Sequence, residues 1–219
     1  MVTILPIAYG NDNYCYLLRK AETIVLIDPG DASKVDEVLQ LSQIKPSRIL
    51  LTHYHQDHCG GARFLADKYG ALLAGPAGVG QENVDNVLEE EGSLETMLSG
   101  IALHVLQTPG HTAVHCCYHL VKQGELFTGD TMFSAGCGRI MGGSAEQLFC
   151  SLQRLASLDK GTRVWFGHEY TCNNLRFALC YESTRVAAQS YLERIEGSDS
   201  GVTTPSTIEL ELRINPFLN

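Results

Sequence analysis

The stretch Thr52-His53-Tyr54-His55-Gln56-Asp57-His58 places three histidines and one aspartate within six residues. It directly follows the apolar run Ile49-Leu50-Leu51, which is typical of a short buried strand. Side chains at the end of a strand lie where the chain leaves the core, and binding sites often occupy such rims. The first two histidines can point to one centre from an extended loop, while the aspartate and the last histidine follow as the chain turns. The stretch therefore predicts two adjacent metal centres that share one loop.

The composition predicts a globular protein of one domain, with or without an appendage. The chain has 219 residues, of which 44% are hydrophobic and 19% are charged, and these proportions are typical of a compact domain. It has no apolar run long enough to cross a membrane, and its first residues lack the basic start of a secretory signal, so we expect a cytoplasmic protein. The formal net charge of -9 disfavours nucleic acid as a partner, because phosphate binding needs a basic face.

The eight cysteines include no C-x-x-C pair. Without signs of export to an oxidising compartment, a disulfide framework is disfavoured, and the thiols are expected to be reduced packing residues. Cys59, next to His58, is likewise expected to pack rather than to act as a nucleophile.

Short strands and helices alternate along most of the chain. Runs rich in β-branched and aromatic residues, bounded by turn residues, predict strands at 4–7, 14–18, 23–28, 49–52, 101–107, 114–121, 126–128 and 164–166. Helical spacing of apolar residues predicts helices around 35–39, over 59–69 and from Ser144, where Gln147 completes a capping box.

After residue 166 the pattern is helical only, over 172–181 and 183–196, which predicts a small helical appendage. The tail is ambiguous. Residues 208–212 alternate like a strand, whereas Ser206 and Glu209 form a capping box that favours a helix.

Three further residues have the context of metal ligands, because each follows a predicted strand and a glycine: His111, Asp130 and His168. Glycine lets the backbone turn so that the next side chain faces a shared rim. A carboxylate at that rim can bridge two cations. The histidines at positions 104, 115 and 119 fall in or near predicted strands, so we expect structural or surface roles for them.

The pattern H-x-H-x-D-H, His, Asp, His resembles the metallo-β-lactamase superfamily. Within that superfamily the chain most resembles glyoxalase II, the hydroxyacylglutathione hydrolases. The additional matches are Asp12-Asn13-Tyr14, Thr131 with Ala135-Gly136-Cys137-Gly138-Arg139, and Gly167-His168-Glu169-Tyr170-Thr171 with Asn173-Asn174-Leu175. Together they cover most of residues 10 to 180 and are far more specific than the histidine motif alone.

The resemblance implies an α+β fold, the αββα metallo-β-lactamase sandwich, with metals at one edge of its two sheets and a short C-terminal helical appendage. It implies a catalytic domain over residues 1–170. The helical C-terminal region, residues 171–219, is shorter than in full-length glyoxalase II.

The resemblance also implies two divalent metal ions per chain. The ligands would be His53, His55 and His111 for one ion, Asp57, His58 and His168 for the other, and Asp130 as the bridge. Zinc suits such a mixture of imidazoles and carboxylates, and iron or manganese fits the same ligands.

The implied mechanism follows from charge. Two divalent cations carry four positive charges, of which Asp57, Asp130 and a bridging hydroxide cancel three, so the site favours hydroxide at neutral pH. This hydroxide is expected to attack a thioester carbonyl while one metal stabilises the developing oxyanion. Asp57 and Asp130 are thus the expected catalytic residues. Asp28 matches a strand-end aspartate of the family and either supports a ligand or caps the turn before Pro29.

The implied substrate is S-lactoylglutathione, cleaved to glutathione and lactate. Arg139 and Tyr170 match residues that recognise the glutathione part in the family. Met141 stands where many members have a tyrosine, and longer relatives continue into a basic segment beyond the last residues of this chain. From Cys172 onward the basic residues are arginines at 176, 185, 194 and 213, each expected to be an ordinary solvated charge.

Other functions fit parts of the same pattern. One is a hydrolase of this fold that acts on another thioester, an ester or a lactone. A second is a persulfide dioxygenase with a single iron, which the full set of two-metal ligands disfavours. A third is a noncatalytic metal-binding protein, which the presence of every expected ligand disfavours. The oligomeric state, the native metal and the acyl group stay open.

Overall fold

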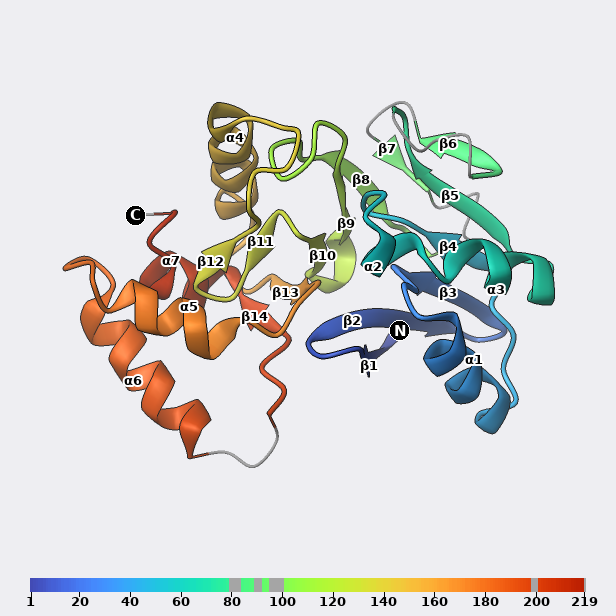
Figure 1. The fold of residues 1–219 in the computed structure, drawn as a ribbon, viewed down its shortest axis with the longest axis horizontal. Helices are drawn as coiled ribbons and strands as arrows, with labels where there is room; N and C mark the ends of the chain where they lie inside the picture. The colour runs from blue at the N-terminus through green and yellow to red at the C-terminus, as the bar shows by residue number, and fades with distance from the viewer. Residues whose placement is uncertain (79–83, 89–91, 95–100, 198–200, 219) are drawn as a thin grey trace.

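In the part of the chain that the structure describes, two six-stranded sheets pack face to face at the centre of the molecule (Figure 1). The computed structural model describes residues 1–78, 84–88, 92–94, 101–197 and 201–218. The first sheet consists, in spatial order, of β1 (Thr3–Tyr9), β2 (Asn13–Lys20), β3 (Thr23–Ile27), β4 (Arg48–Leu50), β5 (Leu72–Pro76) and β6 (Asn86–Leu88). Its strands β1 to β3 are antiparallel, and those from β3 to β6 are parallel.

The second sheet consists, in spatial order, of β14 (Ser206–Thr207), β13 (Arg163–Phe166), β10 (Glu125–Gly129), β9 (Cys116–Leu120), β8 (His104–Gln107) and β7 (Gly92–Ser93). All its neighbours are antiparallel except β10 and β13, which are parallel. A small hairpin of β11 (Met132–Phe133) and β12 (Gly136–Cys137) follows β10. Because β10 and β13 run in the same direction, the residues that follow them emerge at the same edge.

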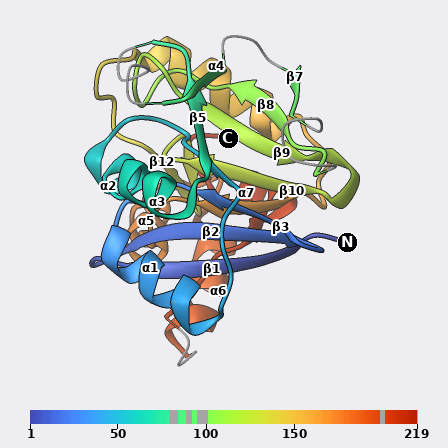
Figure 2. The same cartoon turned by 90° about the vertical axis from the view of Figure 1, so that its right-hand side faces the viewer.

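Helices cover the outer faces of the sandwich. Helices α1 (Ala32–Leu41) and α3 (Ala62–Tyr69) lie over the first sheet (Figure 2). Helix α4 (Ala145–Ala156) packs its apolar stripe into the core of the second sheet, and the short helix α2 (Gln56–Cys59) follows the histidine-rich loop. Helices α5 (Thr171–Ala178), α6 (Arg185–Glu196) and α7 (Ile208–Ile214) gather on one side with an apolar cluster of their own (Figure 1). The 3₁₀ turn η2 (Val121–Gln123) joins β9 to β10.

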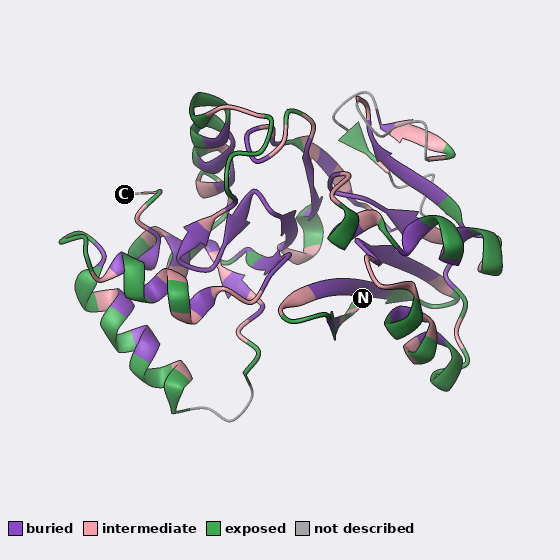
Figure 3. Cartoon of the chain, in the orientation of Figure 1, coloured by how far each residue is buried: buried purple, intermediate pink, exposed green. Residues whose placement is uncertain are grey.

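The core lies between the sheets, where Tyr118, Phe127 and Phe166 are completely buried. In Figure 3 the strands are mostly buried, while the helices expose their outward faces. This layering explains why β2 has a continuous buried run rather than an alternating one, because it is covered on both faces. The α+β sandwich with a helical C-terminal part, expected from the sequence, is confirmed.

The capping box at Ser144 and Gln147 is also confirmed. The single helix predicted over 59–69 is wrong, because Gly60 and Gly61 separate α2 from α3. A Cβ at Gly61 would lie 2.5 Å from the carbonyl oxygen of Pro29, so this close approach of two backbone segments requires a residue without a side chain.

The C-terminal tail is helical, so the strand alternative for residues 208–212 is wrong. The predicted cap is shifted by one residue, because Thr207, not Ser206, accepts the hydrogen bond from the amide of Leu210. The hydroxyl of Ser206 instead donates to the buried carboxylate of Glu211.

Several strand boundaries differ from the sequence prediction. Strand β8 begins at His104 rather than at residue 101, and β9 covers only Cys116–Leu120. Strand β5 was not predicted, because it ends in Gly75 and Pro76, residue types that are depleted in strands.

All eight cysteines are free, as expected. Among the described residues, no helix combines the length and apolar character that crossing a membrane requires.

Candidate metal centre

The histidine-rich loop begins where the first sheet ends. After β4 come Leu51 and Thr52, and then the completely buried His53. His55 has an extended backbone and precedes α2, whose single turn carries Asp57 and His58. The change from extended chain to helix turns these side chains toward one edge of the sandwich.

The first cluster consists of His53, His55 and His111, whose potential ligand atoms gather within 4.8 Å. His53 Nε2 lies 3.1 Å from His55 Nδ1, and His111 Nε2 lies 3.0 Å from the same atom. His111 comes from the loop after β8, where its Nδ1 donates to the carbonyl of Arg139 at 2.5 Å. That bond leaves Nε2 of His111 free to face the cluster.

The second cluster consists of Asp57, His58 and His168. His58 Nε2 lies 3.2 Å from His168 Nε2, and Asp57 Oδ2 lies 3.3 Å from His168 Nε2. His168 follows β13 of the second sheet, whereas the other two residues follow β4 of the first sheet. The cluster therefore joins the two sheets.

Asp130 lies between the clusters. Its Oδ1 is 3.2 Å from His58 Nε2, and its Oδ2 is 3.4 Å from His111 Nε2 and 3.5 Å from His168 Nε2. Among the described residues, Oδ1 of Asp130 is the buried side-chain oxygen or nitrogen that has no hydrogen-bond partner. A buried carboxylate oxygen without a donor is costly unless a cation neutralises it.

Metal ions fit this donor set. The ring nitrogens of His58 and His168 face each other, and so do those of His53, His55 and His111. Where two ring nitrogens face each other, a proton or a cation must lie between their lone pairs. Imidazoles and carboxylates suit zinc, iron and manganese. The seven side chains predicted from the sequence thus lie together, in two groups on either side of one carboxylate.

The charge balance of the second cluster favours a cation. Burial disfavours a charged imidazole, but the carboxylates of Asp130 and Asp28 together outweigh it and hold the pKa of His58 well above its usual value. Burial also opposes charge at His168, yet hydrogen bonds with Asp130 and Asp57 raise its pKa to about 10. At His53, by contrast, burial keeps the pKa well below its usual value, so this imidazole is neutral, the form that binds metals.

Asp28 supports the centre from behind. Its carboxylate accepts hydrogen bonds from the amide of Thr52 at 2.8 Å and from the hydroxyl of Thr52 at 2.6 Å, and its Oδ2 lies 3.0 Å from His58 Nδ1. The side chain therefore orients His58 rather than capping the turn before Pro29. Asp28 also groups with His53 and His58 as a third set of potential ligands, but it meets His58 on the Nδ1 side, away from Asp130.

Two supporting residues were not recognised in the sequence. Asp12 Oδ1 lies 2.8 Å from His168 Nδ1, and the side-chain amide of Asn13 donates to Asp57 Oδ2 at 3.1 Å. The motif Asp12-Asn13-Tyr14 matches the family, but the sequence gives no indication that Asp12 contacts His168 or that Asn13 contacts Asp57. Both residues lie where the turn between β1 and β2 meets the loop after β13.

His115 has the structural role expected for it. It is buried, its Nε2 accepts a hydrogen bond from the amide of Asp130 at 3.2 Å, and its ring stacks on His53. His104 and His119 are cross-strand neighbours in β8 and β9 and do not belong to the clusters.

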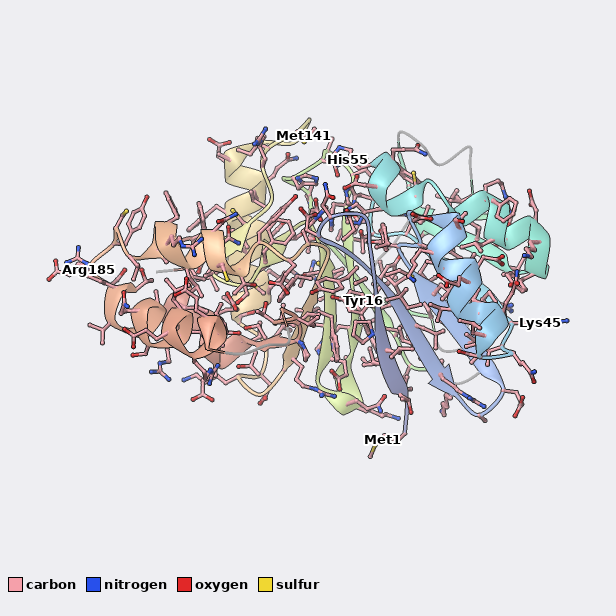
Figure 4. The ribbon with its side chains drawn as sticks, turned by 60° about the horizontal axis from the view of Figure 1, so that its bottom comes forward. Met1, Tyr16, Lys45, His55, Met141 and Arg185 are labelled. Atoms are coloured by element: carbon pink, nitrogen blue, oxygen red, sulfur yellow. The ribbon has the colours of Figure 1, made fainter. Side chains whose placement is uncertain are left out.

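A cavity of about 960 Å³ opens over both clusters. Arg139 and Tyr170 line it, with Arg139 exposed at its rim and the ring of Tyr170 stacked on His168 at 4.9 Å. The rest of its wall is largely apolar and includes Met141, Phe149 and Phe217. Figure 4 shows His55 and Met141 together at one edge of the molecule, with Met1 at the opposite edge.

The arginines at positions 176, 185, 194 and 213 do not line this cavity. Arg176 pairs with Glu196 at 2.8 Å, and Arg194 lies over the ring of Tyr191. Arg185 lies far from His55, at the tip of the helical region (Figure 4).

Comparisons with known proteins agree with this architecture. A family model described as the Metallo-beta-lactamase superfamily matches residues 8–168, and one described as Hydroxyacylglutathione hydrolase C-terminus matches residues 169–219. A hydroxyacylglutathione hydrolase from Chromohalobacter salexigens is 41% identical, over 100% of this chain and 87% of that protein.

Two solved structures have the same fold. The crystal structure of BLEG-1 B3 metallo-beta-lactamase has a TM-score of 0.73 at 24% identity and covers 100% of both chains. The crystal structure of TTHA1623 in a di-iron-bound form has a TM-score of 0.70 at 27% identity, over 98% of this chain and 100% of that one. From its motifs, its fold and these relatives, the chain belongs to the hydroxyacylglutathione hydrolase family of the metallo-beta-lactamase superfamily.

Proposed function

We propose that this protein is a metal-dependent thioester hydrolase that cleaves S-lactoylglutathione to glutathione and lactate. The observation that carries this proposal is the pair of ligand clusters on either side of Asp130, at the floor of a cavity with Arg139 at its rim. The relative from Chromohalobacter salexigens is a hydroxyacylglutathione hydrolase, which supports the choice of substrate.

The metal ligands are part of the proposal. His53, His55 and His111 would hold one divalent ion, Asp57, His58 and His168 the other, with Asp130 between them. When bound, such ions polarise a thioester carbonyl and supply a hydroxide-like nucleophile at neutral pH. Zinc is the metal we favour, and iron is the main alternative because a structural relative was crystallised in a di-iron form.

The side chains of this chain orient the reacting groups. Asp57 is half-exposed, lines the cavity and is anchored by Asn13. The hydrogen bond with His168 keeps the pKa of Asp57 well below its usual value, so its carboxylate is ionised and can accept a hydrogen bond from an attacking water. The departing group is a thiolate, a weak base, so a general acid is not required.

Arg139 is the residue that we assign to an anionic group of the thiol part. Among the described residues that line the cavity, it is the cationic side chain apart from the histidines of the clusters. A guanidinium binds a carboxylate with two parallel hydrogen bonds. Tyr170, beside His168, would contribute a hydroxyl and an aromatic face.

A panel of substrates tests the proposal. Turnover of S-lactoylglutathione should exceed that of a simple acyl thioester and of a lactone, and Arg139→Ala should raise KM for the glutathione compound about tenfold because a charge-assisted contact is lost. Arg185→Ala, far from the cavity, should leave KM unchanged. Equal rates on thioesters with and without glutathione would overturn the assignment of the thiol and leave a general thioesterase.

The apolar wall makes a separate prediction. Phe149 lines the cavity with 57% of its surface exposed, so substrate can cover the ring. Replacing it by alanine should raise KM by about fivefold, equivalent to the partial loss of one aromatic contact. Phe64 on α3 is equally exposed, at 56%, but lies outside the cavity, and Phe64→Ala should have no effect on KM. An equal response of the two variants in steady-state kinetics would argue against substrate contact at this wall.

A further inference from the structure

Glu211, on helix α7, is a completely buried carboxylate outside the metal centre. Its Oε1 accepts hydrogen bonds from the hydroxyls of Ser134, at 3.0 Å, and Ser206. Its Oε2 accepts from the amide of Ala135 at 2.8 Å and from the side-chain amide of Asn215 at 3.2 Å. Four donors on one carboxylate satisfy both oxygens, so the group is a fixed point in the helical region.

Ser134 and Ala135 form the turn of the β11–β12 hairpin, so Glu211 binds this hairpin at its tip. Two asparagines hold the same tip. The side-chain amide of Asn215 donates to the carbonyl of Gly136 at 3.0 Å, and that of Asn174 donates to the carbonyl of Ser134 at 3.0 Å. Ala135 is buried against α5, α6 and α7 in their apolar cluster. The helical C-terminal region therefore surrounds the tip, as the position of β12 beside α5 and α7 in Figure 1 illustrates.

The base of this hairpin lies in the metal centre. Asp130 precedes β11 by two residues, and Arg139 follows β12 by two residues. The carbonyl of Arg139 accepts the hydrogen bond from His111 Nδ1. A Cβ on Gly138 would lie 2.0 Å from the carbonyl oxygen of Asp130 and 2.8 Å from His111 Nδ1. The two ends of the hairpin are packed without free space, so a shift of the hairpin must move Asp130, Arg139 or His111.

We propose that Glu211 is a positioning residue for the metal centre and the substrate-binding arginine. By fixing the tip of the hairpin it fixes Asp130 at one end and Arg139 at the other. The kinetic part of this inference rests on the proposed function, whereas the part that concerns metal affinity rests only on the ligand clusters.

Two substitutions at the same position separate hydrogen bonding from charge. Glu211→Ala removes the carboxylate that accepts all four hydrogen bonds. The metal-free variant should then bind Zn²⁺ about 10- to 100-fold more weakly than the wild type, which is the usual effect of losing a group that orients ligands. It should also raise KM and lower kcat for S-lactoylglutathione. Glu211→Gln should restore both to within about threefold, because its carbonyl can still accept from Ala135 and Asn215, and serine hydroxyls can accept from its amide.

Glu125 provides the matched control for lost stability. It is buried to a similar extent and bonds to Arg163 and to Trp165 Nε1, at 2.7 Å, but it lies at the far end of β10 from Asp130. Glu125→Ala should lower the thermal midpoint yet leave the Zn²⁺ affinity of the folded protein unchanged. If Glu211→Ala and Glu125→Ala both kept the wild-type Zn²⁺ affinity and KM, Glu211 would be merely structural and the proposal wrong.

Ser134→Ala removes one donor of the four and is the variant to use if Glu211→Ala does not fold. Weaker Zn²⁺ binding and a higher KM in this variant, by about two- to fivefold, would support the positioning role, and wild-type values would overturn it. Should the wild-type protein hydrolyse no thioester while Glu211→Ala still weakened Zn²⁺ binding, the proposed function would fail and the positioning role would stand.

Discussion

Asp130→Asn is expected to reduce thioester hydrolysis by about three orders of magnitude, equivalent to about 4 kcal/mol of transition-state stabilisation. The substitution keeps the shape of the side chain and removes its charge. The carboxylate faces His58, His111 and His168, and its Oδ1 is buried without a donor. The asparagine amide is neutral, and its NH2 group is a hydrogen-bond donor that cannot bind a cation. The protein should therefore retain fewer metal ions per chain after dialysis.

The measurements are kcat/KM and metal content on the same sample. Glu125→Gln is the control for the general effects of losing a buried charge, because Glu125 is a buried carboxylate at the start of β10. The Glu125→Gln protein should keep its metal ions and most of its activity. Full metal content in Asp130→Asn, together with a loss of activity below tenfold, would contradict a bridging role for Asp130.

Asp28→Asn is expected to weaken metal binding by about 10- to 100-fold while the fold is retained. The carboxylate accepts from His58 Nδ1, which keeps a proton on Nδ1 and leaves Nε2, the nitrogen that faces Asp130, as the one that would bind a metal ion. An amide nitrogen at this position would donate to Nδ1 and favour the opposite tautomer, in which Nε2 carries the proton and cannot bind a metal. Asparagine also tolerates the positive φ of 54° at this position.

Asp28→Ala should instead destabilise the protein, by about 2–4 kcal/mol in the free energy of unfolding. The amide and hydroxyl of Thr52 would lose their buried acceptor, and alanine suits the backbone conformation less well. Asp31→Ala, which removes the N-cap of α1 from the same loop, should cost about 1 kcal/mol and leave metal binding unchanged. Denaturant unfolding and competition with a chelator check these results. Unchanged metal affinity in Asp28→Asn would show that the tautomer of His58 is set elsewhere.

The predicted ligands could be found in the sequence because their signal is local. A short apolar strand that ends in glycine and histidine predicts a side chain at the rim whatever the remainder of the chain does, as at His111 and His168. Element boundaries were less predictable where packing overrides local pattern. The break between α2 and α3 depends on the contact of Gly61 with Pro29, two residues that belong to different loops.

The sequence by itself determined the chemistry of the site, namely which imidazoles and carboxylates reach the rim and which family the chain resembles. Only the tertiary structure decided what holds them in place. Asp12 meets His168 across 156 positions of the chain, and Glu211 meets Ser134 across 77. The physical reason is that hydrogen bonds between segments so far apart leave no local periodicity or motif, because either partner alone is an ordinary polar residue until folding buries the two together.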